Sequence, residues 1–127
     1  MGYEPSAICS IRAKLFYLKN EKYCEIGVGI FNIKAIESDS QHLQLIFRLE
    51  SSRSGSVLMN IKITKKPTNV TIQKDKNLII TSLPNPPIQQ VTGDESFSDQ
   101  MLVVSYLVKT KTVSDMKNIL DAINLDF

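Results

Sequence analysis

The sequence predicts a mainly β domain, in which a curved antiparallel sheet of seven strands forms a partly open barrel or sandwich closed by one C-terminal α-helix. Two observations predict this fold. Short apolar or alternating segments rich in strand-forming residues follow one another from residue 8 to residue 109, separated by turn-forming residues. After residue 112 the apolar residues instead recur at helical spacing. A terminal helix can cover the open end of such a curved sheet.

The length and composition are those of one globular domain. We expect residues 1–127 to form a single domain with an ordered core at about 8–125, because 127 residues with 43% hydrophobic content can bury a core. The net charge of +2 is too small to favour nucleic acid as the main ligand. No apolar run reaches the length of about 18 residues that a membrane span needs. We therefore expect a monomer that binds neither nucleic acid nor a membrane.

The first two strands are predicted to form a hairpin. Residues 8–18 alternate apolar and basic positions, residues 22–33 are apolar and β-branched, and residues 20–21 lie at the turn between them. Cys9 and Cys24 then lie far apart along the hairpin, so a disulfide between them is excluded by geometry. We expect both cysteines to be reduced.

Two glycines interrupt the second strand. Gly27 and Gly29 are two residues apart, so they share a face of the strand and strip it of side chains. Glycine inside a strand is unfavourable, and it usually marks a bulge, a bend or the close approach of another backbone. We expect a structural role for both glycines. A nucleotide-binding role is disfavoured, because no third glycine follows and the pattern continues as a strand.

The middle of the chain reads as further strands joined by loops. Residues 35–42 are polar and are predicted to be a loop, and three prolines keep residues 83–88 out of a central strand. Residues 89–100 have few large apolar groups and are predicted to form a long, mobile loop. The predicted strands after the first hairpin are residues 43–49, 57–63, 70–73, 78–82 and 101–109.

The chain ends in a predicted amphipathic helix. Thr112 is suited to cap its N-terminus, and Asp115 suits the first turn through capping and the helix dipole. Four apolar residues then follow at the spacing i, i+3, i+4, i+7, and we expect them to be buried against the sheet. They are Met116, Ile119, Leu120 and Ile123.

The residues favour a binding module over an enzyme. The single histidine, His42, lies in a polar segment, where a histidine is usually solvated. The sequence has no spacing typical of zinc ligands, of a Cys–His pair or of a Ser–His–Asp triad. We therefore expect no catalytic site, no metal and no cofactor.

Several motifs resemble the Ran-binding domain, a family of pleckstrin-homology-like fold. The first hairpin of that family carries a lysine-rich strand, an aromatic residue, an acid and a Gly-x-Gly. The same order occurs here, with the basic strand at residues 12–16, the aromatic residue at Tyr23, the acid at Glu25 and the Gly-x-Gly at residues 27–29. Its next hairpin is similar to residues 43–48 and 58–61, and its closing strand and helix to residues 104–124.

The proline-rich segment points to one class within the Ran-binding domain family. Residues 83–88 are similar to the C-terminal domain of the nucleoporin-fifty class of nuclear basket proteins, and the match spans roughly residues 9–125. The resemblance implies binding of Ran in its GTP form, within a nuclear pore complex protein on the nucleoplasmic side that supports protein transport. It leaves open a contact with importins through regions outside this chain. Basic side chains would meet the acidic tail of Ran; the candidates are Lys14, Lys22, Arg48, Lys62, Lys65 and Lys66, with Asn60, beside structural Tyr23, Gly27 and Gly29.

The sequence departs from the family pattern in the first hairpin. Tyr23 stands where the family usually has tryptophan, and Cys24 and Ile26 replace basic residues on either side of Glu25. These losses imply weaker binding of Ran. One alternative is a peptide or protein scaffold domain of the same fold, in which a peptide adds to a sheet edge or lies beside the helix. A phosphoinositide site is a further alternative, disfavoured because no tight basic cluster lies between the first two strands.

Overall fold

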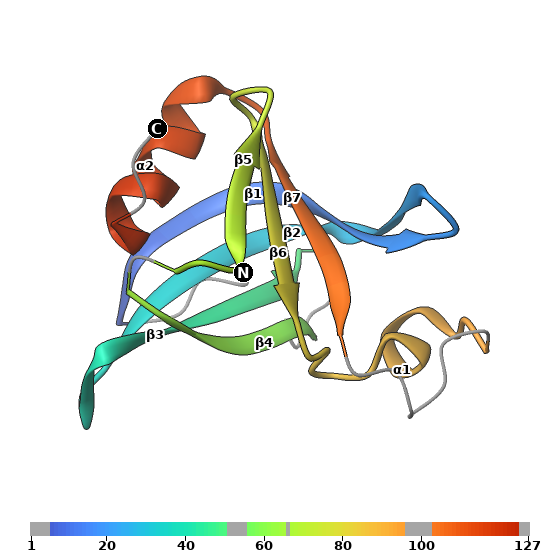
Figure 1. Cartoon of the computed structure of the whole chain (residues 1–127), viewed down its shortest axis with the longest axis horizontal. Helices are drawn as coiled ribbons and strands as arrows, with labels where there is room; N and C mark the ends of the chain where they lie inside the picture. The colour runs from blue at the N-terminus through green and yellow to red at the C-terminus, as the bar shows by residue number, and fades with distance from the viewer. Residues whose placement is uncertain (1–5, 51–55, 66, 96–102, 125–127) are drawn as a thin grey trace.

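One antiparallel sheet forms most of the molecule. The computed structural model describes residues 6–50, 56–65, 67–95 and 103–124. Within them the sheet has the order β4-β3-β2-β1-β7-β6-β5 and curls into a half-open barrel, with helix α2 against β1, β2 and β7 (Figure 1). The mainly β fold with a C-terminal helix is therefore confirmed. The elements are β1 (Ala7–Lys19), β2 (Lys22–Ile36), β3 (Asp39–Leu49), β4 (Val57–Thr64), β5 (Val70–Gln73), β6 (Asn77–Ser82), α1 (Ile88–Thr92), β7 (Val104–Thr110) and α2 (Val113–Ile123).

The β1–β2 hairpin turns where the sequence predicts. Asn20 and Glu21 both have positive φ, of 50° and 66°, as a tight two-residue hairpin turn requires. The hairpin contains a bulge, because Leu15 faces Gly27 whereas the next residue of β1 faces Glu25. Ile26 is the extra residue at this bulge, and its side chain is half-buried against the core.

The second glycine of β2 lies where the backbone of β3 comes close. A Cβ at Gly29 would overlap the carbonyl oxygen of Arg48 and lie 2.8 Å from its carbonyl carbon. A Cβ at Gly27 would instead meet only the side-chain methyl groups of Leu49 and Leu58, at 2.9 and 3.1 Å. Of the three alternatives considered for these glycines, the close approach of another backbone occurs at Gly29 and a bulge lies immediately before Gly27.

The prediction of a loop at residues 35–42 is wrong. Strand β2 continues to Ile36 and β3 begins at Asp39, so only two residues separate them. The loop was predicted because these residues are polar, but they form the exposed end of a hairpin and not an irregular loop. The carboxylate of Asp39 stabilises this end by accepting a hydrogen bond from the backbone N–H of Gln41, at 3.1 Å.

A short helix replaces the beginning of the predicted long loop. Residues 88–92 form α1, so the loop prediction is wrong for residues 89–92. Ile88 is 2% exposed and anchors the segment in the core, and Gly93 ends the helix with a left-handed φ of 74°. Residues 96–100, and the first two residues predicted for the last strand, lie outside the described residues.

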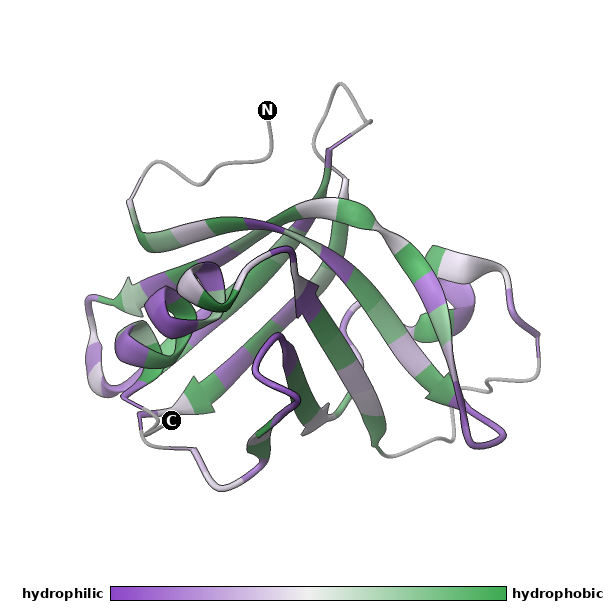
Figure 2. Cartoon of the chain, turned by 90° about the horizontal axis from the view of Figure 1, so that it is seen from above, coloured by the Kyte–Doolittle hydropathy of each residue, from purple (hydrophilic) through white to green (hydrophobic). Residues whose placement is uncertain are grey.

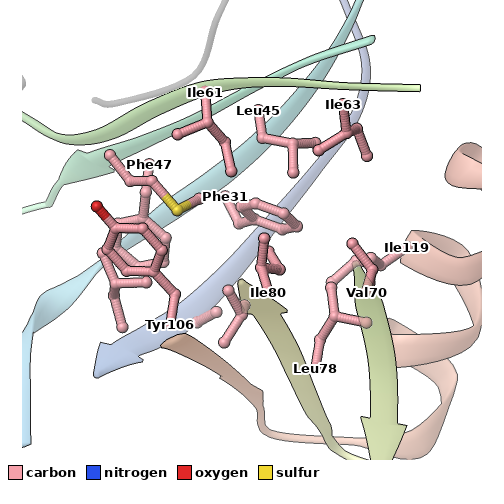
Figure 3. Close-up of a cluster of buried hydrophobic side chains, with 14 of the residues drawn as sticks. Phe31, Leu45, Phe47, Ile61, Ile63, Val70, Leu78, Ile80, Tyr106 and Ile119 are labelled. Atoms are coloured by element: carbon pink, nitrogen blue, oxygen red, sulfur yellow. The ribbon is translucent and has the colours of Figure 1, made fainter. Parts of the chain in front are cut away.

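Apolar side chains from both halves of the sheet meet inside the barrel. Hydrophobic and hydrophilic residues alternate along the strands (Figure 2), and Figure 3 shows side chains from β2 to β7 and α2 converging on one cluster. Tyr106 is fully buried there, and burial raises the pKa of its phenol to about 12. The four apolar residues predicted for α2 are all buried, and the Thr112 hydroxyl accepts a hydrogen bond from the Asp115 N–H at 3.1 Å, as predicted.

The free edge of β4 is covered by the proline-rich segment. The backbone N–H of Asn60 donates to the carbonyl oxygen of Asn85 at 2.6 Å, and the side-chain amide of Asn85 donates to the carbonyl oxygen of Asn60 at 2.9 Å. Residues 83–88 therefore lie beside the sheet without joining it as a regular strand, in agreement with their prolines.

Candidate functional site

A positively charged groove crosses the outer face of β1 and β7. We call it the cationic groove. Its volume is about 330 Å³, and four of its eight lining side chains are cationic. Arg12, Lys14 and Phe16 of β1 share one face of the strand, because side chains at i, i+2 and i+4 point the same way, and Ala13 between them also lines the groove. It is lined by Arg12, Ala13, Lys14 and Phe16 of β1, Val28 of β2, Lys109 and Thr110 of β7, and Lys111.

Two lysines face each other directly across the groove. Lys14 of β1 is the register partner of Lys109 of β7, and both side chains are exposed. Directly opposed side chains of an antiparallel pair have Cβ atoms about 4.5–5.5 Å apart, so like charges there destabilise the sheet. An arrangement that costs stability in the free domain is one that an anionic partner would relieve.

Acidic side chains compensate this charge only in part. Glu25 lies 3.9 Å from the Lys14 ammonium, with both side chains about half exposed, and such a pair contributes little in water. Arg12 Nε donates to both carboxylate oxygens of Glu50, at 2.9 Å each. Among the described residues, no acidic side chain lies within 4.0 Å of the ammonium of Lys109 or Lys111. The groove therefore keeps a net positive charge.

The floor of the groove is apolar. Phe16 and Val28 are half-buried and line the groove beside Lys14, since Phe16 follows it by two residues on β1 and Val28 is its register partner on β2. Phe16 is the register partner of Leu107, which is 8% exposed, so the apolar floor continues into β7. A floor of this kind beneath a cationic rim suits an acidic polypeptide segment that also carries apolar side chains.

The structure does not bring the sequence-predicted basic residues together. Lys14 lies in the cationic groove, whereas Lys22 lies at the turn of the first hairpin, opposite Lys19. Arg48 lies on β3, Lys62 on β4, and Lys65 just beyond the end of β4. Lys66 lies outside the described residues.

Two of the predicted residues on β4 already have partners within the domain. The side-chain oxygen of Asn60 accepts a hydrogen bond from the side-chain amide of Gln44, at 2.9 Å. The Lys62 ammonium lies 3.3 Å from the carboxylate of Asp39. That carboxylate also lies 2.6 Å from Nδ1 of His42, and its interaction with His42 is the main reason that its pKa is lowered to about 2. A partner that binds Lys62 would have to compete with Asp39.

Tyr23 does not belong to the core. It lies on the arm of the first hairpin, opposite Leu18, and its side chain is 37% exposed. Cys24 and Ile26, which flank Glu25, are both half-buried and pack against the core. The two positions at which the Ran-binding family carries basic residues are therefore apolar in this hairpin.

Most of the cationic groove was not predicted from the sequence. Arg12, Lys109 and Lys111 were part of matched segments but were not among the predicted site residues. The sequence does contain a pattern that could have indicated the groove, namely basic residues at the i, i+2 spacing of one strand face. This spacing occurs at Arg12 and Lys14 and again at Lys109 and Lys111. Their meeting depends on the pairing of β1 with β7, two strands that are far apart in the sequence.

The described residues include neither a candidate metal site nor a candidate membrane-spanning helix. No group of three His, Cys, Asp or Glu side chains among them could hold a metal ion. No helix in this part of the chain is both long and apolar enough to cross a membrane.

Comparison with known proteins identifies relatives of one kind. No family model matches the chain. The chain is 31% identical to the nuclear pore complex protein Nup50 of Rattus norvegicus and 30% identical to Nup50 of Homo sapiens, over 114 residues in each case. Each match covers 88% of this chain but 22% of the relative, so the chain spans about a fifth of the length of these relatives.

Solved structures share the fold. The crystal structure of the Ran-binding domain of Nup2 from Ashbya gossypii matches with a TM-score of 0.68 and 17% identity, over 94% of this chain and 91% of that chain. A second structure of the same domain matches with a TM-score of 0.67 over 94% of both chains. The predicted pleckstrin-homology-like architecture of a Ran-binding domain is therefore confirmed as the fold.

Proposed function

Because this chain is homologous to a segment of the nucleoporin Nup50, we propose that it is a Ran-binding module of a nuclear pore complex protein. The module binds the small GTPase Ran in its GTP-bound form and supports transport of protein cargo through the nuclear pore, on the nucleoplasmic side. It acts as a monomer, and importins bind to regions outside this chain. The fold, which it shares with the Ran-binding domain of Nup2, supports this proposal.

The opposed lysines of the cationic groove are the observation that carries the proposal. Lys14 and Lys109 face one another on the outer face of the sheet, with Arg12 and Lys111 beside them. The resemblance to Ran-binding domains implies that an acidic tail of Ran is clasped by basic side chains. An acidic segment in the groove would offset the repulsion between the two lysine ammonium groups and would cover the apolar side chain of Phe16. Sheet residues and loops then contact the switch region of the GTPase.

The other predicted basic residues form an outlying part of the same interaction. We expect these lysines and Arg48 mainly to steer Ran towards the domain, and the neutral Asn60 to act only by direct contact. The basic residues concerned are Lys22, Arg48, Lys62 and Lys65, which lie away from the groove, and Lys66, which lies outside the described residues. Steering of this kind raises the association rate and weakens as salt increases.

We expect weaker binding than in a Ran-binding domain with the full basic pattern. A charge-assisted contact with good geometry contributes roughly 1.5–3 kcal/mol. Cys24 and Ile26 cannot make such contacts, and both pack against the core instead. The loss of one or two contacts lowers the affinity by roughly one to a few factors of ten, since about 1.4 kcal/mol corresponds to tenfold.

Titration calorimetry tests the proposal. Ran is loaded with a GTP analogue or with GDP, and each form is titrated into the domain at low and at physiological salt. We expect binding of the GTP-analogue form, weaker binding at higher salt, and little binding of Ran that lacks its acidic tail. Equal binding of the two nucleotide forms, or no binding at low salt with protein well above micromolar concentration, would remove Ran from the proposal.

Charge reversal locates the interaction. Lys14→Glu and Lys109→Glu should each reduce the affinity for Ran by about tenfold or more, because each replaces an attraction to the acidic tail by a repulsion. The matched control is Lys117→Glu, the same charge change on the exposed face of α2. If Lys117→Glu weakens binding as much as the groove variants do, net charge governs binding and the groove is not the site.

A further inference from the structure

The first half of β1 has one edge without a strand neighbour. Strand β7 pairs with β1 only from Ala13 to Tyr17, and its last residue, Thr110, faces Ala13. Residues 7 and 9–12 pair with β2 on one side, Ile8 being the extra residue at a register shift, and on the other side residues 7–12 have no strand partner among the described residues. Helix α2 lies beside this part of β1 (Figure 1). Backbone groups along such an edge are available to another extended chain.

A groove runs along this edge between β1 and α2. We call it the edge groove; its volume is about 490 Å³. Four consecutive β1 residues line it, although consecutive side chains point to opposite faces of a strand. A groove with four consecutive residues in its wall therefore follows the backbone edge and not one face. It is lined by Ile8, Cys9, Ser10 and Ile11 of β1 and by Asn118, Asp121 and Ala122 of α2.

The lining sets the chemistry of an occupant. Ile8 is 55% exposed, and the other walls include the short side chains of Ser10 and Ala122, so small or β-branched apolar groups fit. The only charged side chain in the lining is Asp121, which is exposed on α2. Asp115 also lies near the groove, since its charge, after burial, contributes to raising the pKa of the Cys9 thiol. An occupant with basic side chains complements this wall.

We propose that the edge groove binds an extended basic peptide of a partner protein, which adds to β1 as a further strand beside α2. Backbone hydrogen bonds to residues 8–11 supply affinity, and alternate side chains of the peptide fill the apolar wall and approach Asp121. Four edge residues span about 13 Å at roughly 3.3 Å per residue, which accommodates a strand of about four residues. The acidic wall selects against an acidic peptide.

This site is separate from the one proposed for Ran. The cationic groove lies over the pairing of β1 with β7, whereas the edge groove begins where that pairing has ended. The two grooves have opposite charge, so they select oppositely charged segments. A failure of peptide binding and a failure of Ran binding are therefore distinguishable in experiments on the same protein.

The test uses a synthetic heptapeptide that alternates lysine and valine, titrated into the ¹⁵N-labelled domain. We expect amide shift changes at residues 8–11 and 118–122, and no changes from the peptide with glutamate in place of lysine. Two further peptides are N-methylated, one at every valine and one at every lysine. One of them should fail to bind, because N-methylation removes the donors that face β1. Equal binding of both N-methylated peptides, or no binding at about 1 mM peptide, would overturn the proposal.

Charge variants complete the test. Asp121→Lys should weaken binding of the lysine peptide about threefold to tenfold and leave the affinity for Ran unchanged. Glu95→Lys is the matched control, since Glu95 is exposed beside α1, at the other end of the molecule from α2 (Figure 1). An unchanged affinity of Asp121→Lys for the peptide, or shifts at residues 8–11 that depend on protein concentration without peptide, would contradict a basic peptide as the occupant.

Discussion

Gly29→Ala should destabilise the domain by about 3 kcal/mol. The added Cβ would overlap the carbonyl oxygen of Arg48, so β2 and β3 must separate locally. Overpacking in a well-packed interior costs about 1–3 kcal/mol. The separation also weakens the ladder where Gly29 faces Leu49 and Ile30 faces Arg48, at about 0.5–1.5 kcal/mol for each hydrogen bond lost. Alanine loses less backbone entropy on folding than glycine does, which offsets about 0.5–1 kcal/mol of this loss.

Gly27→Ala is the matched control for this experiment. Its Cβ would meet only the ends of two leucine side chains, which can change rotamer, so we expect a loss within about 1 kcal/mol. Urea unfolding of both variants measures the difference, and thermal unfolding should show Gly29→Ala about 10 °C lower, given a few degrees per kcal/mol at this size. A loss for Gly29→Ala equal to that for Gly27→Ala, or below about 1 kcal/mol, would refute the close approach of the two backbones.

Three further predictions concern the fold. Leu120→Ala should lower the free energy of unfolding by about 2–5 kcal/mol, because Leu120 is 2% exposed in α2; a loss below about 0.5 kcal/mol in urea unfolding would show that the helix is not docked. Ile26→Arg should lower the melting temperature, since Ile26 packs against the core at the bulge, and an unchanged temperature with tighter Ran binding would place this side chain outside. Asp39 has a pKa of about 2 instead of 3.8, so its carboxylate stabilises the folded state above about pH 4 and this is lost as pH falls towards 2. Asp39→Asn should remove that part of the acid sensitivity in urea unfolding between pH 2 and 5, and an identical pH profile would contradict it.

The strands and the C-terminal helix could be predicted from local patterns in the sequence. Period-two alternation located the strands, and the cap at Thr112 with its downstream apolar residues located α2. Composition was a poorer guide where polar residues occupy the end of a hairpin, as at Asp39, and where one buried residue anchors a short helix, as Ile88 does. In both places a few hydrogen bonds or one buried side chain decided the structure, and neither leaves a periodic pattern.

The candidate site was harder to predict because it depends on strand pairing. Lys14 was identified from its motif, whereas Lys109 enters the site only because β7 pairs with β1 in one particular register. A shift of that register by one residue would turn Lys109 to the other face of the sheet. Lys62 shows the reverse case, since its charge is plain in the sequence but the structure places it beside Asp39. Sequence patterns give the face of a residue; the non-local pairing decides its neighbours.

The contact of Asn85 with Asn60 bears on the association of this domain with other chains through the edge of β4. An uncovered β4 would present unpaired backbone groups to other chains and so favour edge-to-edge aggregation. Asn85 occupies both backbone groups of Asn60, through its carbonyl oxygen and its side-chain amide. The proline-rich segment cannot extend this pairing into a full strand, because its prolines lack N–H donors. Edge-to-edge association of this domain through β4 is thus restrained at Asn60 by a segment that cannot itself offer a full strand edge.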